Sequence, residues 1–129
     1  MKSQFSLHAP HEHHFIRTVG PEGVRIGDEI YPAPVLVAPD RIVREWGPAS
    51  LDGLEEAHLE PLLELEPEVV LLGTGARQAF VHPSRLAPLY RRQVGVELMT
   101  TDAACRTYNV LAAEERRVVA ALLPMNPAA

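Results

Sequence analysis

The chain has 129 residues, 47% of them hydrophobic and 22% charged, a balance typical of one globular domain that excludes a largely disordered chain. The formal net charge of -5 argues against a nucleic-acid partner, because affinity for a phosphate backbone needs a basic face. No run approaches the ~20 apolar residues of a membrane span and the start lacks a signal-peptide core, so we expect a cytoplasmic protein, with docking to a membrane through another protein left open.

The first third of the chain is expected to form β-strands. Residues 15–46 contain short apolar and β-branched runs separated by Gly-Pro and Pro-Asp turn signals, which is typical of an antiparallel meander. The turn Pro39-Asp40, between "VLVA" and "RIVREW", predicts a hairpin. The 12 prolines, about double the usual ~5% share, favour many short elements over a few long helices.

Helices and strands are expected to alternate in the remainder. The run "EEAHLEPLLELEP" predicts a short helix beginning near Ala57 or His58, because Pro61 fits only in a first turn. "EVVLL" predicts a strand buried on both faces. A second helix is predicted near residues 84–93 with Gly95 as its C-cap, although Pro88 conflicts with a helix interior.

The last third is expected to be strand, helix and strand. "GVELM" predicts a short strand, and "TTDAACRTYNVLAAEE" predicts the longest helix with Thr101 as its N-cap and Asp102 in its first turn. Periodicity would also permit one helix through residue 123. We interpret "VVAALL" as a buried strand instead, because six apolar residues in a row suit the centre of a sheet.

These elements predict an α/β fold with some α+β character. We expect a single three-layer domain in which a β-rich N-terminal third is followed by alternating helices and strands on a mixed sheet. The domain is expected to cover residues 15–123. Residues 1–14 are expected to be a mobile N-terminal segment, and residues 124–129 a C-terminal tail.

Three segments resemble a known family. They are "APDRIVREW", "PEVVLLGTGARQAF" and "GVELMTTDAACRTYNVLAAEERRVVAALL", and the chain is similar through them to a small uncharacterised α/β domain family of bacteria and archaea. Its animal relatives include an adipogenesis-associated protein and an assembly factor of mitochondrial respiratory complex I. The resemblance implies a three-layer fold, no established catalytic activity and an interaction function. In "AEER", Glu115 stands where many relatives have glycine, which leaves the turn before the last strand open.

The Gly73-Thr74-Gly75 loop is the most conspicuous candidate site. Two glycines let a backbone approach a ligand closely, and N–H groups at a strand end can bind an anion. Nucleotide-binding loops need more than this: a following Lys-Ser/Thr, or a third glycine that opens a helix. Neither is present, and Pro83 intervenes before the next helix, so we favour a structural turn over a phosphate site.

A weaker version of the site hypothesis remains, because ligands of open α/β sheets bind beyond the carboxyl ends of parallel strands. If the "EVVLL" and "GVELM" strands are parallel neighbours, one small pocket would collect residues from the loop and from the following helix. Its candidate residues are Gly73, Thr74, Gly75, Arg77, Gln78, Thr101 and Arg106.

Other chemistry-bearing residues are given structural interpretations. Cys105 is a possible reactive thiol beside Arg106, but its helical position favours a core thiol. The first 14 residues contain four histidines: His8, His11, His13 and His14. They lack the spacing of a zinc site, so we predict that the protein binds neither a metal nor a cofactor.

Two classes of function follow. The leading hypothesis is a protein-interaction or assembly-type module with another protein as partner and no established catalytic activity. The alternative is a small-molecule or anion-binding protein, or an enzyme, that uses the pocket at the Gly73-Thr74-Gly75 end of the sheet. Phe80 is interpreted as a core anchor, whereas an exposed Phe80 would indicate a partner surface.

Overall fold

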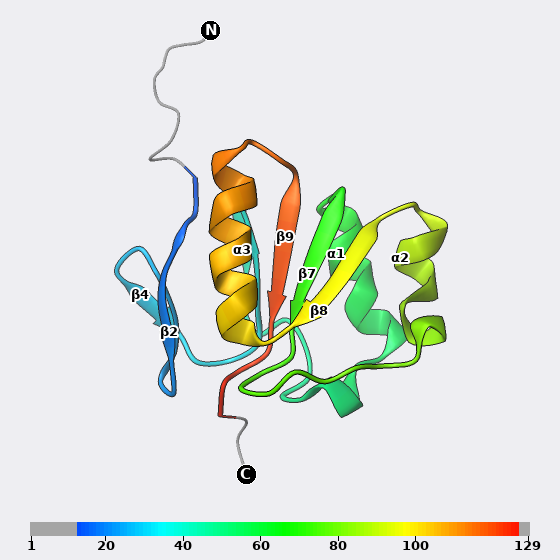
Figure 1. The fold of residues 1–129 in the computed structure, drawn as a ribbon, viewed down its shortest axis with the longest axis horizontal. Helices are drawn as coiled ribbons and strands as arrows, with labels where there is room; N and C mark the ends of the chain where they lie inside the picture. Colours follow the sequence, from blue (N-terminus) through cyan, green and yellow to red (C-terminus); the bar gives the residue numbers. More distant parts are fainter. Residues whose placement is uncertain (1–12, 127–129) are drawn as a thin grey trace, which may run out of the picture.

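The structure is a computed structural model that describes residues 13–126, and its centre is a mixed five-stranded sheet (Figure 1). The strands in spatial order are β6 (Arg41–Val43), β5 (Val35–Ala38), β9 (Val118–Leu122), β7 (Val69–Gly73) and β8 (Gly95–Met99). Strands β9, β7 and β8 are parallel, whereas β5 is antiparallel to both β6 and β9. The mixed sheet and the Pro39-Asp40 hairpin are therefore confirmed.

The N-terminal meander forms a second sheet of its own. Its three antiparallel strands are β2 (Ile16–Gly20), β3 (Gly23–Ile26) and β4 (Glu29–Tyr31). Pro32 and Pro34 separate β4 from β5, and neither can donate a backbone hydrogen bond to a ladder. The β-rich third is thus divided between two sheets at these prolines, a division that the turn signals alone did not predict.

Helices lie on both faces of the large sheet (Figure 1). One face carries α3 (Thr101–Ala113), with the small sheet packed beside it. The other face carries short helices and 3₁₀ turns: η2 (Leu51–Gly53), η3 (Glu56–Leu59), α1 (Glu60–Glu64), η4 (Pro83–Leu86) and α2 (Ala87–Arg91). This arrangement is the predicted three-layer architecture.

Strand β9 shows why the last apolar run is a strand. Val118, Ala120 and Leu122 pack toward α3, while alternate residues, such as Val119 and Ala121, pack toward the α1 and α2 layer. All five residues of β9 are buried, and full burial of a valine or leucine side chain contributes about 1.5–3 kcal/mol. A helix would have needed a polar face, so the strand prediction for "VVAALL" is confirmed.

Two proline positions agree with the helix starts. Pro61 lies in the first turn of α1, as predicted. The conflict at Pro88 disappears because residues 83–86 form the 3₁₀ turn η4, after which α2 begins, with Pro88 in its own first turn. A proline in a first turn loses no intrahelical hydrogen bond.

Two predicted caps were wrong by one or two residues. The N-cap of α3 is Thr100, whose side chain accepts a hydrogen bond from the Ala103 backbone at 3.2 Å, and Thr101 is the first helical residue. Gly95 is not a C-cap because it begins β8; the left-handed residue after α2 is Gln93, at φ 63°. Thr100 and Thr101 offer the same cap chemistry, which sequence alone did not distinguish, whereas Gln93 enters the left-handed region although it is not a glycine.

Glu115 ends α3 in the left-handed conformation. Its φ is 62°, a backbone region that glycine enters freely and that other residues enter at a cost. The turn before β9 therefore forms at this position without a glycine.

Candidate functional site

The Gly73-Thr74-Gly75 turn lies where β7 meets the start of α3. A Cβ atom on Gly73 would come within 2.9 Å of the Thr101 Cα atom and 3.1 Å of the Leu122 side chain. Gly75 has φ 102°, which L side chains rarely adopt. Gly73 is thus required by the close approach of β7 to its neighbours, and Gly75 by its backbone conformation.

Thr101 ties three segments together at this turn. Its side chain is fully buried; its hydroxyl accepts a hydrogen bond from the Gly75 N–H at 2.8 Å and donates one to the Leu123 carbonyl at 2.7 Å. The Thr101 N–H donates to the Gly75 carbonyl at 2.9 Å. The end of β7, the start of α3 and the end of β9 are joined through one side chain.

Thr74 fixes the loop that follows. Its hydroxyl lies 2.7 Å from the Arg77 carbonyl and accepts from the Ala79 N–H at 3.2 Å. Its own N–H donates to the Met99 carbonyl at 2.8 Å. The N–H groups of Thr74 and Gly75, which an anion would need, are therefore used within the fold itself.

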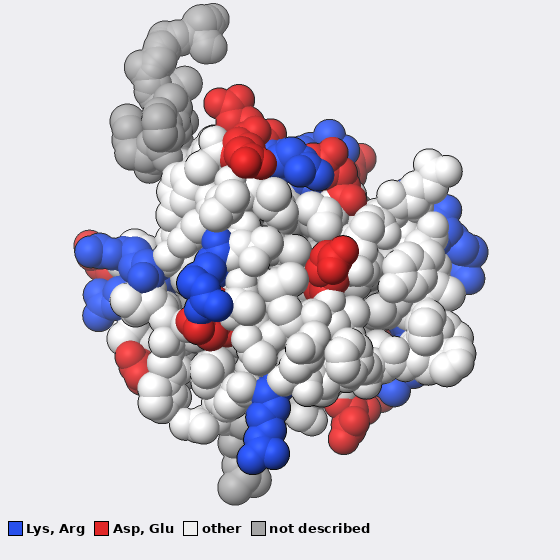
Figure 2. Space-filling view, viewed as in Figure 1, with Lys and Arg blue, Asp and Glu red and all other residues white. Residues whose placement is uncertain are grey.

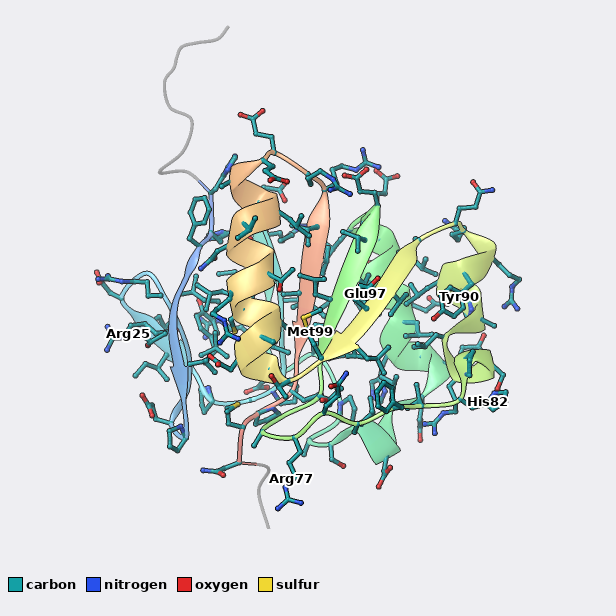
Figure 3. All side chains as sticks on the ribbon, viewed as in Figure 1. Arg25, Arg77, His82, Tyr90, Glu97 and Met99 are labelled. Carbon is teal, nitrogen blue, oxygen red and sulfur yellow. The ribbon has the colours of Figure 1, made fainter. Side chains whose placement is uncertain are left out.

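The arginines of the candidate pocket lie apart from this turn. Figure 3 shows Arg77 pointing away from the lower end of the sheet. Arg106 pairs with Asp102 one helical turn away, and 68% of its side chain is exposed. Gln78 donates to the Leu98 carbonyl at 3.1 Å, so it contacts β8. A small-molecule site at this end stays a prediction, with Thr101 and the glycine turn as its assembled part.

Cys105 is a core side chain. Only 4% of it is exposed, and it packs among the buried residues between α3 and the sheet. Burial, with a smaller contribution from Asp102, raises the pKa of the thiol to about 12, and the opposing effect of Arg106 is weaker. The thiol is therefore protonated at neutral pH, whereas a nucleophile needs the thiolate.

The N-terminal histidines divide between described and undescribed parts of the chain. His8 and His11 lie outside the described residues. His13 packs against Phe15 at 6.1 Å between ring centroids, and the His14 N–H donates to the Pro39 carbonyl at 2.9 Å. Within residues 13–126 no group of three or more His, Cys, Asp or Glu side chains is placed to hold a metal ion.

Phe80 is exposed, contrary to our interpretation of it as a core anchor. Its exposed fraction is 75%, although the neighbouring Ala79 and Val81 pack against the core. Tyr90 on α2 is also 44% exposed. Residues 79–81 are all apolar, so the sequence did not show which of them faces the core; that depends on the loop path that Thr74 and Gln78 fix.

Asn109 is a structural residue that the sequence did not reveal. Its side-chain amide donates to the Ile16 carbonyl at 2.7 Å and accepts from the Ile16 N–H at 2.9 Å. These two hydrogen bonds satisfy the Ile16 backbone as a neighbouring strand would, and they join the small sheet to α3. Nothing local to Asn109 indicates a contact with a residue 93 positions away.

A hollow of about 700 Å³ lies at the opposite end of the large sheet from the glycine turn. Its walls come from the β5–β6 turn, the segment after α1, the end of α3 and the start of β9. The rim carries charges of both signs, including Asp40, Glu66 and Arg117. Arg117 is fixed there because its side chain donates to the Glu66 carbonyl at 2.9 Å.

These features define a small α/β domain in which the backbone N–H groups of the glycine turn are hydrogen-bonded within the protein. The chain belongs to the family described as "Protein of unknown function (DUF498/DUF598)", which matches residues 16–123. This confirms the resemblance inferred from the three sequence segments.

Named relatives and solved structures agree with this assignment. The chain is 38% identical over 111 residues to NADH dehydrogenase (ubiquinone) 1 alpha subcomplex assembly factor 3 of Danio rerio, covering 84% of this chain and 63% of that protein. A crystal structure from Bordetella parapertussis is 37% identical with a TM-score of 0.81, covering 87% of this chain and 96% of that chain. A solution structure from Bordetella pertussis, described as a Mth938-like domain, is 27% identical with a TM-score of 0.82, covering 98% and 95%.

The chain spans less than two thirds of that Danio rerio relative. The function of the whole assembly factor can therefore be assigned to this chain only as a proposal. No helix within residues 13–126 combines the length and apolar character needed to cross a membrane.

Proposed function

We propose that this protein is a protein-binding module that helps to assemble a larger complex, and that it acts by contact rather than by catalysis. The exposed Phe80 carries the proposal. Large aromatic side chains supply much of the energy at protein interfaces because they bury a large area at a small cost in side-chain entropy. A phenylalanine that is 75% exposed loses this burial energy until a partner covers it.

The loop that carries Phe80 is held in place before any partner binds. Thr74 bonds to both ends of residues 77–79, and Gln78 bonds to β8. A fixed loop has little conformational entropy left to lose on binding. Relatives named as assembly factors of NADH dehydrogenase support the same class of function.

Affinity purification of the tagged protein from its own cells tests the proposal. We expect a stoichiometric partner that is lost or strongly reduced with Phe80→Ser. Val110→Ser is the matched control, because Val110 is an exposed apolar residue (58%) of α3, outside the loop. Recovery of no partner at low salt, or equal recovery with both variants, would contradict the proposal.

A further inference from the structure

Strand β8 is an edge of the large sheet, because it pairs with β7 alone. Gly95 donates its N–H to the Glu68 carbonyl, and the Met99 carbonyl accepts from Thr74, so these residues direct their backbone groups toward β7. Backbone groups alternate along a strand. Val96 and Leu98 therefore direct theirs outward, away from β7.

This edge carries little protection. Natural edge strands are shielded by lysine, proline, bulges or short length, whereas β8 has five residues with an unbroken register and none of these residue types. Gln78 donates to the Leu98 carbonyl from an exposed position. Within the described chain, the Val96 N–H, the Val96 carbonyl and the Leu98 N–H have no hydrogen-bond partner.

The face beside this edge carries one isolated charge. Figure 2 shows few charged side chains over the part of the surface formed by α3, β7 and β8, with most charges gathered toward the rim. Figure 3 places Glu97 on this face, over the β7–β8 part of the sheet. Glu97 is exposed, and its neighbours on the same face include Met99 and Leu71.

Pairing of β8 with a second copy of the chain is disfavoured. An antiparallel pair that bonds Val96 of each copy to Leu98 of the other would place the two Glu97 side chains directly opposite each other. Like charges in that position are destabilising, whereas opposite charges stabilise. In this register Glu97 disfavours a second copy of β8 and favours a strand with a cation opposite it.

Phe80 and Tyr90 lie in the segments that flank this edge. Phe80 belongs to the loop that Gln78 anchors to β8, and Tyr90 belongs to α2, which packs against β8 and lies on the outer side of β8 in Figure 1. Both side chains are exposed. The two segments next to the edge thus each carry an exposed aromatic side chain.

We propose that β8 binds an extended segment of a partner protein as an added strand, with a lysine or arginine of that segment opposite Glu97. The proposal rests on the proposed function and names the chemistry of the partner. Backbone hydrogen bonds to Val96 and Leu98 would supply affinity, and the Glu97 pair would supply selectivity, as in other strand-addition complexes. The partner N–H would replace Gln78 at the Leu98 carbonyl.

Titration of the isotope-labelled full chain with two peptides tests this. Each peptide has nine residues of alternating threonine and valine, and the central residue is lysine in one and glutamate in the other. We expect the lysine peptide to shift the amide resonances of Val96 and Leu98 and to bind about fivefold more tightly than the glutamate peptide. Glu97→Lys should reverse the preference, whereas Glu60→Lys, an exposed charge reversal on α1, should leave it unchanged.

Unchanged amide resonances of Val96 and Leu98 at millimolar peptide would overturn the proposal, as would a preference that Glu97→Lys does not reverse. The two proposals can fail separately. A cellular partner that depends on Phe80, combined with no peptide binding at β8, would leave the assembly function standing and remove strand addition. Peptide binding at β8 without any cellular partner would support strand addition and remove the assembly function.

Discussion

Thr101 shows how much of the glycine turn is determined by a single side chain. Its hydroxyl is buried, accepts from Gly75 and donates to Leu123. A buried polar group left without a partner costs about 1–3 kcal/mol. Removing this hydroxyl would leave two backbone groups unsatisfied at once.

Thr101→Val should therefore lower the free energy of unfolding by about 2–4 kcal/mol, measured by urea denaturation. Thr101→Ser keeps the hydroxyl and should lose less, because only the methyl contacts go. Equal losses for the two variants would show that packing, and not the hydrogen bonds, makes Thr101 important.

Cys105 gives a second prediction at the scale of one residue. The folded-state pKa of about 12 exceeds the ordinary value of 9.0, so burial favours the protonated thiol. The associated stability is complete below pH 9 and is lost as the pH rises toward 12. We expect native Cys105 to resist a thiol reagent at pH 8 until the chain unfolds; labelling of the native protein as fast as in urea would contradict this.

Among the elements, the turn that follows α3 carries backbone strain at Glu115. Glu115 has φ 62°, and the left-handed conformation costs a non-glycine residue roughly 1–2 kcal/mol. Glu115→Gly should raise the free energy of unfolding by about 1 kcal/mol, measured by thermal or urea unfolding.

The preceding residue provides the control for that change. Glu114 has φ -86°, an ordinary conformation in which glycine only adds freedom to the unfolded chain. Glu114→Gly should therefore destabilise the protein. Stabilisation by both variants would indicate an effect of charge, not of backbone conformation.

The start of β7 is joined to the segment before β9 by Glu68. Its carboxylate accepts from the Arg116 side chain at 2.8 Å and from the Arg117 N–H at 3.3 Å. The hydrogen bond from Arg116 is the main cause that holds the pKa of Glu68 below its ordinary value of 4.5. A lowered pKa means that the folded state favours the charged carboxylate.

The stability from this contact is present above the ordinary pKa and is lost as the pH falls through the lower, folded-state value. Glu68→Gln should therefore show a smaller fall in melting temperature between pH 7 and pH 3 than the wild-type chain. An unchanged difference in melting temperature would show that Glu68 contributes nothing to the acid sensitivity.

For the whole molecule, the sequence was informative where the signal was local. The apolar run of β9, the Pro39-Asp40 turn and Pro61 indicated their elements because each depends on nearby residues alone. The division of the strands into two sheets, the Asn109 contact with β2 and the outward side of Phe80 depend on packing between distant segments. Of the candidate site, Thr101 and the glycine turn were brought together, while Arg77 and Arg106 were not, because helix phase and loop path decide where their side chains point.

In the whole molecule, the backbone N–H groups of Thr74 and Gly75 form hydrogen bonds within the fold, whereas the Phe80 side chain and the edge of β8 are exposed. Photo-crosslinking in the protein's own cells, with a photoreactive phenylalanine at position 80 or at position 110, tests this account most directly. We predict one discrete adduct with another protein from position 80 and none from position 110. The absence of an adduct at position 80, or the same adducts from both positions, would contradict the account.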